Sequence, residues 1–165
     1  MDCQLATTPW HQMKADWLVI GVPSNGEPSA RLTALDQALG RTLTRLRETG
    51  DLTGKPANLL TIHDAIGIPA GRVLLVGLGD PKELTVAVFE KAMRTAARQV
   101  SEKENVQVAV TWDTNGPLAP AVFVQTAVTA FTVGCVGQDL YRTEPVRFEL
   151  SDVTILSDPA LPSCA

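Results

Sequence analysis

Short runs of consecutive apolar residues recur along the chain and alternate with segments of helical periodicity. The apolar runs predict buried strands at residues 16–22, 58–62, 72–80 and 106–110, and one or two more strands within 147–156. The run at 72–80 contains four consecutive apolar residues without polar alternation. Such a run is typical of a strand that is covered on both faces, as in a parallel sheet with helices on either side.

Three segments show the spacing of three and four residues that predicts a helix. Leucines at this spacing predict a helix over residues 29–50, which Gly40 can break or bend. Thr85 is a candidate N-cap for a second helix that ends near Val100, and a third helix is expected over residues 117–137. The order strand, helix, strand, strand, helix, strand, helix, strand predicts a three-layer αβα domain with a mixed, mostly parallel sheet.

The composition is that of one globular domain. The chain has 165 residues, and we assign residues 1–157 to a single α/β domain and 158–165 to a C-terminal tail or the start of a linker. Hydrophobic residues make up 45% and charged residues 19%, which excludes intrinsic disorder as the global state. The uncharged segment 114–138 has no apolar run long enough to cross a membrane. The net charge of -4 argues against nucleic acid as a partner, because phosphate binding requires a basic surface.

The cysteines and the N-terminus bear on the cellular compartment. Cys3, Cys135 and Cys164 are too few and too scattered for a disulfide framework or a zinc site. The N-terminal segment also lacks the basic-then-apolar pattern of a secretory signal peptide. We therefore expect a reducing, cytoplasmic setting and no metal ion or other cofactor in this chain.

Two glycine-rich strand exits form a candidate ligand crevice, because ligands of open α/β sheets bind beyond the carboxyl ends of the strands. Its candidate residues are Gly21, Asn25, Gly26, Gly77, Gly79 and Asp80. Glycines permit close approach of the backbone to a ligand, but they serve equally in tight strand-to-helix turns, and this second interpretation is favoured. The exit at 77–80 lacks the third glycine of a dinucleotide fingerprint, and the chain has no phosphate-loop motif.

No arrangement of side chains typical of catalysis is visible in the sequence. His63 and Asp64 are adjacent at a predicted strand end, so their side chains point to opposite faces and do not hold each other. His11 lies in a polar stretch and has no evident partner. Arginines of the first predicted helix alternate with acidic residues, which is typical of a solvated helix face: Arg41, Arg45 and Arg47 beside Asp36 and Glu48.

The order of several motifs resembles the N-terminal domain of the leucine (cytosol) aminopeptidases, a family of two-metal exopeptidases. The similarity runs from about residue 15 to residue 156. It is carried by segments 15–22, 35–40, 50–55, 72–79, 84–85 and 92–98, and by Gly134-Cys135 with Tyr141-Arg142-Thr143. The segment 72–79, which reads RVLLVGLG, is the most specific of them.

The resemblance implies a three-layer fold similar to macro domains, with no metal ligands or catalytic residues of its own. In the family, a C-terminal catalytic domain that this chain does not contain binds two divalent ions, zinc or manganese. By resemblance, the chain alone is not an enzyme. Its implied role is to help assemble a homo-oligomer and to restrict access to the active site, with the catalytic domain of the same protein as its partner. At residues 136–140 the chain lacks aromatic residues common in the family, so docking on a catalytic domain is expected to differ.

The uncharged third helix is the candidate interface for such contacts. Its apolar side chains spread over most of its circumference, so one stripe faces the sheet and the remainder needs another cover. A neighbouring helix, a second subunit or the catalytic domain can supply this cover. The candidate interface residues are Phe123, Val124, Val128 and Phe131. We expect weak self-association through this region or the strand edge beside it.

Two other functions stay open beside the assembly role. One is a stand-alone module that binds ADP-ribose or another nucleotide in the macro-like crevice. Neither glycine loop offers an extended phosphate cradle, so we expect ADP-ribose to bind no more tightly than about 0.1 mM. The other is DNA binding, which some members of the family add. The acidic charge balance and the small number of lysines argue against it.

Overall fold

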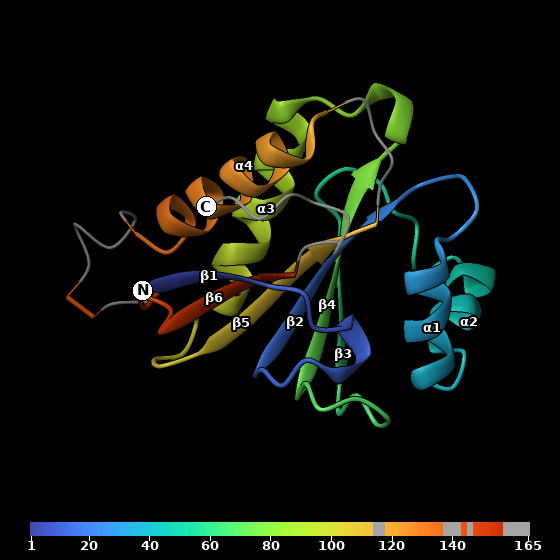
Figure 1. The fold of residues 1–165 in the computed structure, drawn as a ribbon, viewed down its shortest axis with the longest axis horizontal. Coiled ribbons are helices and arrows are strands. Elements are labelled where there is room, and N and C mark those ends of the chain that lie inside the picture. Colours follow the sequence, from blue (N-terminus) through green and yellow to red (C-terminus); the bar gives the residue numbers. More distant parts are fainter. Residues whose placement is uncertain (114–117, 137–142, 145–146, 157–165) are drawn as a thin grey trace.

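A mixed sheet forms the centre of the domain, and helices cover both of its faces (Figure 1). The computed structural model describes residues 1–113, 118–136, 143–144 and 147–156. Its strands lie in the order β1-β6-β5-β2-β4-β3, and all neighbours are parallel except β3 and β4. Their bounds are β1 (Asp2–Ala6), β2 (Trp17–Pro23), β3 (Leu59–His63), β4 (Arg72–Gly79), β5 (Gln107–Trp112) and β6 (Asp152–Leu156). The predicted α/β fold with a mostly parallel sheet is confirmed.

The helices lie in two layers, with α3 and α4 on one face of the sheet and α1 and α2 on the other (Figure 1). Their bounds are α1 (Ala30–Ala38), α2 (Thr42–Thr49), α3 (Val86–Val100) and α4 (Pro120–Gly134), with short 3-10 helices η1 (Trp10–Gln12) and η2 (Pro81–Glu83). Thr85 caps α3 as predicted, since its hydroxyl accepts a hydrogen bond from the Val88 N–H at 3.3 Å. None of the described helices is long and apolar enough to cross a membrane.

Alternating side chains of the central strands fill two separate hydrophobic cores. Leu74 and Val76 of β4 join the core beneath α3 and α4, which also contains Phe89 and Phe131. Leu75, between them in sequence, belongs to the core beneath α1 and α2. Because both faces of β4 are buried, every position of the strand favours an apolar residue. This explains the unbroken apolar run from which the strand was predicted.

The predicted helix over residues 29–50 is in fact two helices. Ser29 caps the first, as its hydroxyl accepts a hydrogen bond from the Leu32 N–H at 3.2 Å. Gly40 and Arg41 adopt left-handed backbone conformations, with φ angles of 65° and 62°, and separate α1 from α2. A right-handed helix cannot continue through two such residues. The break expected at Gly40 is confirmed, and it creates a corner between the two helices.

Sequence analysis did not predict the N-terminal elements β1 and η1. β1 lies at the edge of the sheet and is largely exposed, so its residues need not be apolar. η1 buries Trp10, which is 4% exposed and packs in the core beneath α1 and α2. Of the predicted strand region 147–156, residues 152–156 form β6. The predicted tail 158–165 and both ends of the predicted helix 117–137 lie outside the described residues.

Candidate functional site

The glycines at the end of β4 are covered by the chain itself. A Cβ atom on Gly77 would lie 1.8 Å from the carbonyl oxygen of Lys55, and one on Gly79 would lie 2.8 Å from the Pro56 ring. Gly79, whose φ is +77°, also donates its N–H to the Gly54 carbonyl oxygen at 2.9 Å. This neighbouring segment occupies the space that a ligand would need. The close packing at Gly77 and Gly79 therefore supports the tight-turn interpretation that the sequence favoured, and a ligand crevice there stays a prediction.

Gly21 of β2 is also closely packed against other residues of the chain. A Cβ atom at this position would lie 2.8 Å from Cδ1 of Leu78 and 3.1 Å from Cβ of Trp112. Two side chains from the neighbouring strands β4 and β5 therefore fill the space above it. Gly21 thus lets these large side chains close over the sheet, which gives it a packing role, and its place in a ligand crevice stays a prediction.

Asn25, Gly26 and Asp80 form the accessible part of the predicted crevice. The Asn25 side-chain amide donates to one Asp80 carboxylate oxygen at 3.1 Å, and the Lys82 backbone N–H donates to the other at 2.9 Å. The hydrogen bond from the Lys82 N–H, and after it the one from Asn25, hold the pKa of Asp80 below its ordinary value because they stabilise the ionised form. Gly26 has a φ of +89° and open space around it. The structure thus joins the loop after β2, which contains Asn25 and Gly26, to Asp80 after β4. The Asp80 carboxylate gives this place a negative charge.

Asp113 is a buried acidic residue at the same end of the sheet that the sequence did not reveal. It follows β5 directly and is 8% exposed. Its carboxylate accepts a hydrogen bond from the Ser29 N–H at 3.3 Å, and its own N–H donates to the Gly21 carbonyl oxygen at 2.7 Å. Asp113 therefore fastens the start of α1 to the sheet. With Asp80, it puts two carboxylates at the ends of strands that flank β2, an arrangement that disfavours a pyrophosphate.

The histidines and described cysteines do not assemble into a reactive site. His63 ends β3 as an exposed residue, and the His11 ring is hydrogen-bonded to the neighbouring Gln12 side chain at 3.4 Å. Burial raises the pKa of the Cys135 thiol, and partial burial raises that of the Cys3 thiol. A raised pKa opposes formation of the reactive thiolate. Within the described ranges, no three His, Cys, Asp or Glu residues are grouped so that they could hold a metal ion.

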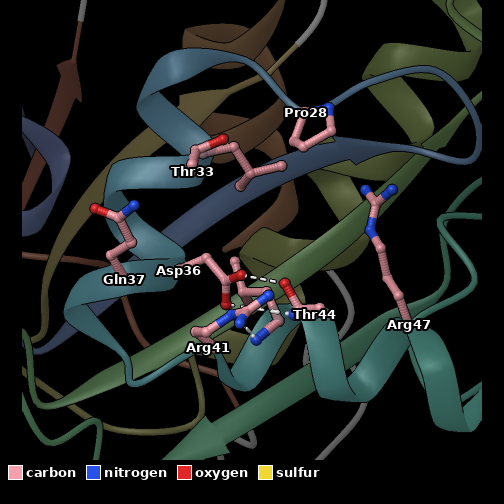
Figure 2. Close-up of a pocket in the computed structure, with 9 residues that line it drawn as sticks. Pro28, Thr33, Asp36, Gln37, Arg41, Thr44 and Arg47 are labelled. Atoms are coloured by element: carbon pink, nitrogen blue, oxygen red, sulfur yellow. Dashed lines mark hydrogen bonds between the residues drawn. The ribbon is translucent and has the colours of Figure 1, made fainter.

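A pocket of about 330 Å³ lies at the corner between α1 and α2 (Figure 2). We call it the α1–α2 pocket, and its lining residues are Pro28, Leu32, Thr33, Asp36, Gln37, Arg41, Leu43, Thr44 and Arg47. Figure 2 shows Arg41 near Asp36 and Arg47 on the far side of the pocket. The arginines interpreted as one solvated helix face are therefore divided, since Arg41 and Arg47 line the pocket and Arg45 does not.

Asp36 joins the two helices at this pocket. Its carboxylate accepts hydrogen bonds from the backbone N–H groups of Leu43 and Thr44, at 2.8 and 3.3 Å, and from the Thr44 hydroxyl. The carboxylate thus caps the N-terminus of α2, where the helix dipole stabilises a negative charge. Asp36 lies seven and eight residues before Leu43 and Thr44, which is not the spacing of an ordinary N-cap. The cap could not be predicted from the sequence because it depends on the sharp turn at Gly40 and Arg41.

α4 buries two of the four residues that were selected as an interface. Phe123 is 4% exposed and Phe131 is 0% exposed, and both belong to the core beneath α3 and α4. The Phe123 ring packs edge-to-face on Phe89 with a centroid distance of 4.8 Å. Val124 and Val128 are half-buried against the same core. The interface prediction is therefore corrected for Phe123 and Phe131, because α3 and the sheet cover the aromatic side of α4, and it stays a prediction for Val124 and Val128.

The opposite side of α4 is exposed and carries no charge. We call it the outer α4 face, and it comprises Ala121, Gln125, Thr129, Thr132, Val133 and, directly after the helix, Val136. Val133 and Val136 are 49% and 59% exposed. The hydroxyls of Thr129 and Thr132 donate to backbone carbonyl oxygens one helical turn earlier, at 2.9 and 2.8 Å. This face therefore offers a partner mainly methyl groups.

Residues 19–145 match the sequence model described as the cytosol aminopeptidase family, N-terminal domain. The chain belongs to this family. It is 39% identical over 103 residues to a probable cytosol aminopeptidase of Methylobacillus flagellatus, which covers 62% of this chain and 21% of the relative. It is 41% identical over 88 residues to one of Cupriavidus pinatubonensis, which covers 53% of this chain and 17% of the relative. The chain thus spans about a fifth of the length of these cytosol aminopeptidases.

Solved structures show the same fold at low sequence identity. A tomato leucine aminopeptidase superimposes with a TM-score of 0.77 and 22% identity over 99% of this chain and 34% of its own. The macrodomain of Mycobacterium tuberculosis DarG superimposes with a TM-score of 0.65 and 13% identity over 94% of this chain and 98% of its own. The expected macro-domain-like architecture of this cytosol aminopeptidase domain is confirmed, and at these identities the likeness concerns the fold alone.

Proposed function

We propose that this chain is a non-catalytic domain of a cytosol aminopeptidase and that it serves in assembly and in limiting access to the active site. The match to the N-terminal domain of the family over residues 19–145 carries the proposal. Most of each relative lies outside the part that this chain matches. The parent activity is the two-metal removal of N-terminal amino acids from peptides, and the remaining part of such a protein supplies it.

The two divalent ions of the parent reaction do not fit the described residues of this chain. Such ions, zinc or manganese, require a cluster of carboxylate, histidine or similar donors. The described ranges contain no such group of three or more His, Cys, Asp or Glu residues. We therefore assign both ions to the remaining part of a full-length relative and derive no catalytic step within this domain.

The outer α4 face supports the assembly role. The other long helices carry charges among their exposed or half-exposed residues, such as Arg45 in α2 and Lys91 in α3, whereas α4 carries none. An uncharged face loses little hydration when it packs against a partner. We assign a second copy of this domain to this face, because a contact between two uncharged α4 faces places no like charges against each other.

The compartment and the remaining partners follow from the same proposal. The curated relatives are named as cytosol aminopeptidases, and we propose a cytoplasmic location for this chain too. We propose no membrane partner and no nucleic acid partner, since the chain is acidic. A Trypanosoma brucei macrodomain solved with ADP-ribose shares the fold, with a TM-score of 0.64 and 16% identity. The filled glycine positions and the two carboxylates disfavour that ligand here.

Peptidase assays test the non-catalytic role. We expect the folded chain, incubated with leucine p-nitroanilide and added Mn²⁺ or Zn²⁺, to release nitroaniline no faster than the metal-only blank. A circular dichroism spectrum of the same sample shows that the domain is folded, and a full-length cytosol aminopeptidase serves as the positive control. The proposal would be refuted if hydrolysis depended on the chain and the chain kept a stoichiometric amount of metal after dialysis.

A further inference from the structure

The α1–α2 pocket has the construction of a small-molecule site. Its volume of about 330 Å³ lies within the range of ligand pockets. Leu32 and Leu43 are each 3% exposed and form its apolar base. Asp36 ties α1 to α2 through three hydrogen bonds to the first turn of α2, so the two walls are held at a fixed spacing. The pocket is therefore preformed, and a ligand does not have to order it.

The charges at the pocket favour an anion. The single carboxylate of the lining, Asp36, already accepts three hydrogen bonds at the N-terminus of α2, so its oxygens are occupied by the protein itself. Arg47 is held against the Pro23 carbonyl oxygen at 3.4 Å. In the described part of the chain, the Arg41 guanidinium has no hydrogen-bond or ion-pair partner. The lining thus carries two guanidinium groups and one carboxylate, a net positive charge in a domain that is acidic as a whole.

The backbone at Arg41 adds a second reason. Its φ of 62° is a left-handed conformation that is strained for a residue other than glycine. Glycine at this position would form the same turn without that strain, as Gly40 does next to it. The strained position therefore brings an arginine side chain to the pocket that the turn itself does not require.

We propose that the α1–α2 pocket binds a small amphipathic anion, a carboxylate or a phosphate monoester attached to a short branched apolar group. The apolar group lies on Leu32 and Leu43, and the anionic group is bound by Arg41, with Arg47 on the opposite side. Thr33 and Gln37 of α1 provide further polar groups at the rim. This site lies on the opposite face of the sheet from α4, so it is independent of the proposed assembly surface.

Titrations of the whole chain test this site with three probes of the same shape. They are isocaproate, isoamyl phosphate and the neutral isocaproamide, followed by the amide NMR shifts of α1 and α2. We expect one or both anions to bind with a Kd of about 1 mM or tighter, and the neutral probe at least about tenfold more weakly. Binding of isocaproate alone assigns a carboxylate ligand, and binding of isoamyl phosphate alone assigns a phosphate monoester.

The variant Arg41→Gln separates the pocket from general charge effects. We expect it to weaken anion binding at least about tenfold, because a charged hydrogen-bond donor is lost. Arg45→Gln removes the same charge from α2 outside the pocket and is expected to leave the Kd within about twofold. No shifts at α1 and α2 up to the solubility limit, equal binding of the neutral probe, or equal effects of the two variants would overturn the proposal. None of these outcomes bears on peptidase activity or assembly.

Discussion

Replacing Phe131 with alanine is expected to lower the free energy of unfolding by about 4 kcal/mol. Phe131 is 0% exposed and packs in the core that α3, α4 and the sheet share. Removing its ring leaves a cavity that the surrounding helices and strands cannot fill without moving. Urea unfolding followed by circular dichroism measures the difference. Val133→Ala on the same helix is the matched control, and since Val133 is 49% exposed we expect a loss below about 1 kcal/mol.

Phe131→Leu keeps this test decisive if the alanine variant does not fold, because it retains most of the side-chain volume and should cost about 1.5 kcal/mol. The contrary result is a Phe131→Ala variant that unfolds like the wild type but self-associates less. That combination would return Phe131 to the interface for which the sequence suggested it. The structure instead makes it a residue of the domain's own core.

Gly77→Ala is expected to cost about 3 kcal/mol of unfolding free energy. The added Cβ would lie 1.8 Å from the Lys55 carbonyl oxygen and 2.7 Å from the Gly54 carbonyl carbon, so backbone segments have to separate. Gly26→Ala is the matched control. It has open space around the new methyl group, and its φ of +89° should cost only about 1 kcal/mol. Urea unfolding of both variants measures the difference.

A stable Gly77→Ala variant would contradict the packing role of this glycine. If its loss stayed below about 1 kcal/mol, the segment at Lys55 would be free to move away from β4. The space beyond β4 would then be available to a ligand, and the crevice predicted from the glycine pattern would regain its support. The stability difference between Gly77→Ala and Gly26→Ala therefore decides what the glycine-rich exit does.

The parts of the fold that were predictable are those in which burial leaves a local pattern. β4 is buried on both faces and reads as an unbroken apolar run, and Thr85 caps α3 at the position where a hydroxyl precedes helical periodicity. β1 has no such pattern because it is an exposed edge strand whose pairing with β6 depends on residues far away in sequence. Local patterns cannot report a contact of that kind.

The candidate site was less predictable, because its properties arise from packing across the sequence. A glycine pattern does not say whether a ligand or a backbone segment fills the adjacent space, and at Gly77 the answer lies with Lys55. The uncharged character of α4 was predicted correctly, but the sequence left open whether a neighbouring helix, a second subunit or the catalytic domain covers its aromatic residues, and in the structure Phe123 and Phe131 pack in the core shared with α3. The role of Asp36 likewise depends on a turn that only the structure specifies.

Sedimentation equilibrium of the chain over a concentration series tests most directly whether the outer α4 face is an assembly surface. We expect reversible self-association with a Kd of about 1 mM, and Thr129→Lys to weaken it at least about tenfold by placing a charge on that face. Thr33→Lys is the matched control. Like Thr129, Thr33 is an exposed helical threonine whose hydroxyl donates to a backbone carbonyl oxygen one turn earlier, but it lies in the helix layer on the opposite face of the sheet. It should leave the association unchanged. A strictly monomeric wild type at millimolar concentration, or equal effects of the two lysines, would contradict the assembly role.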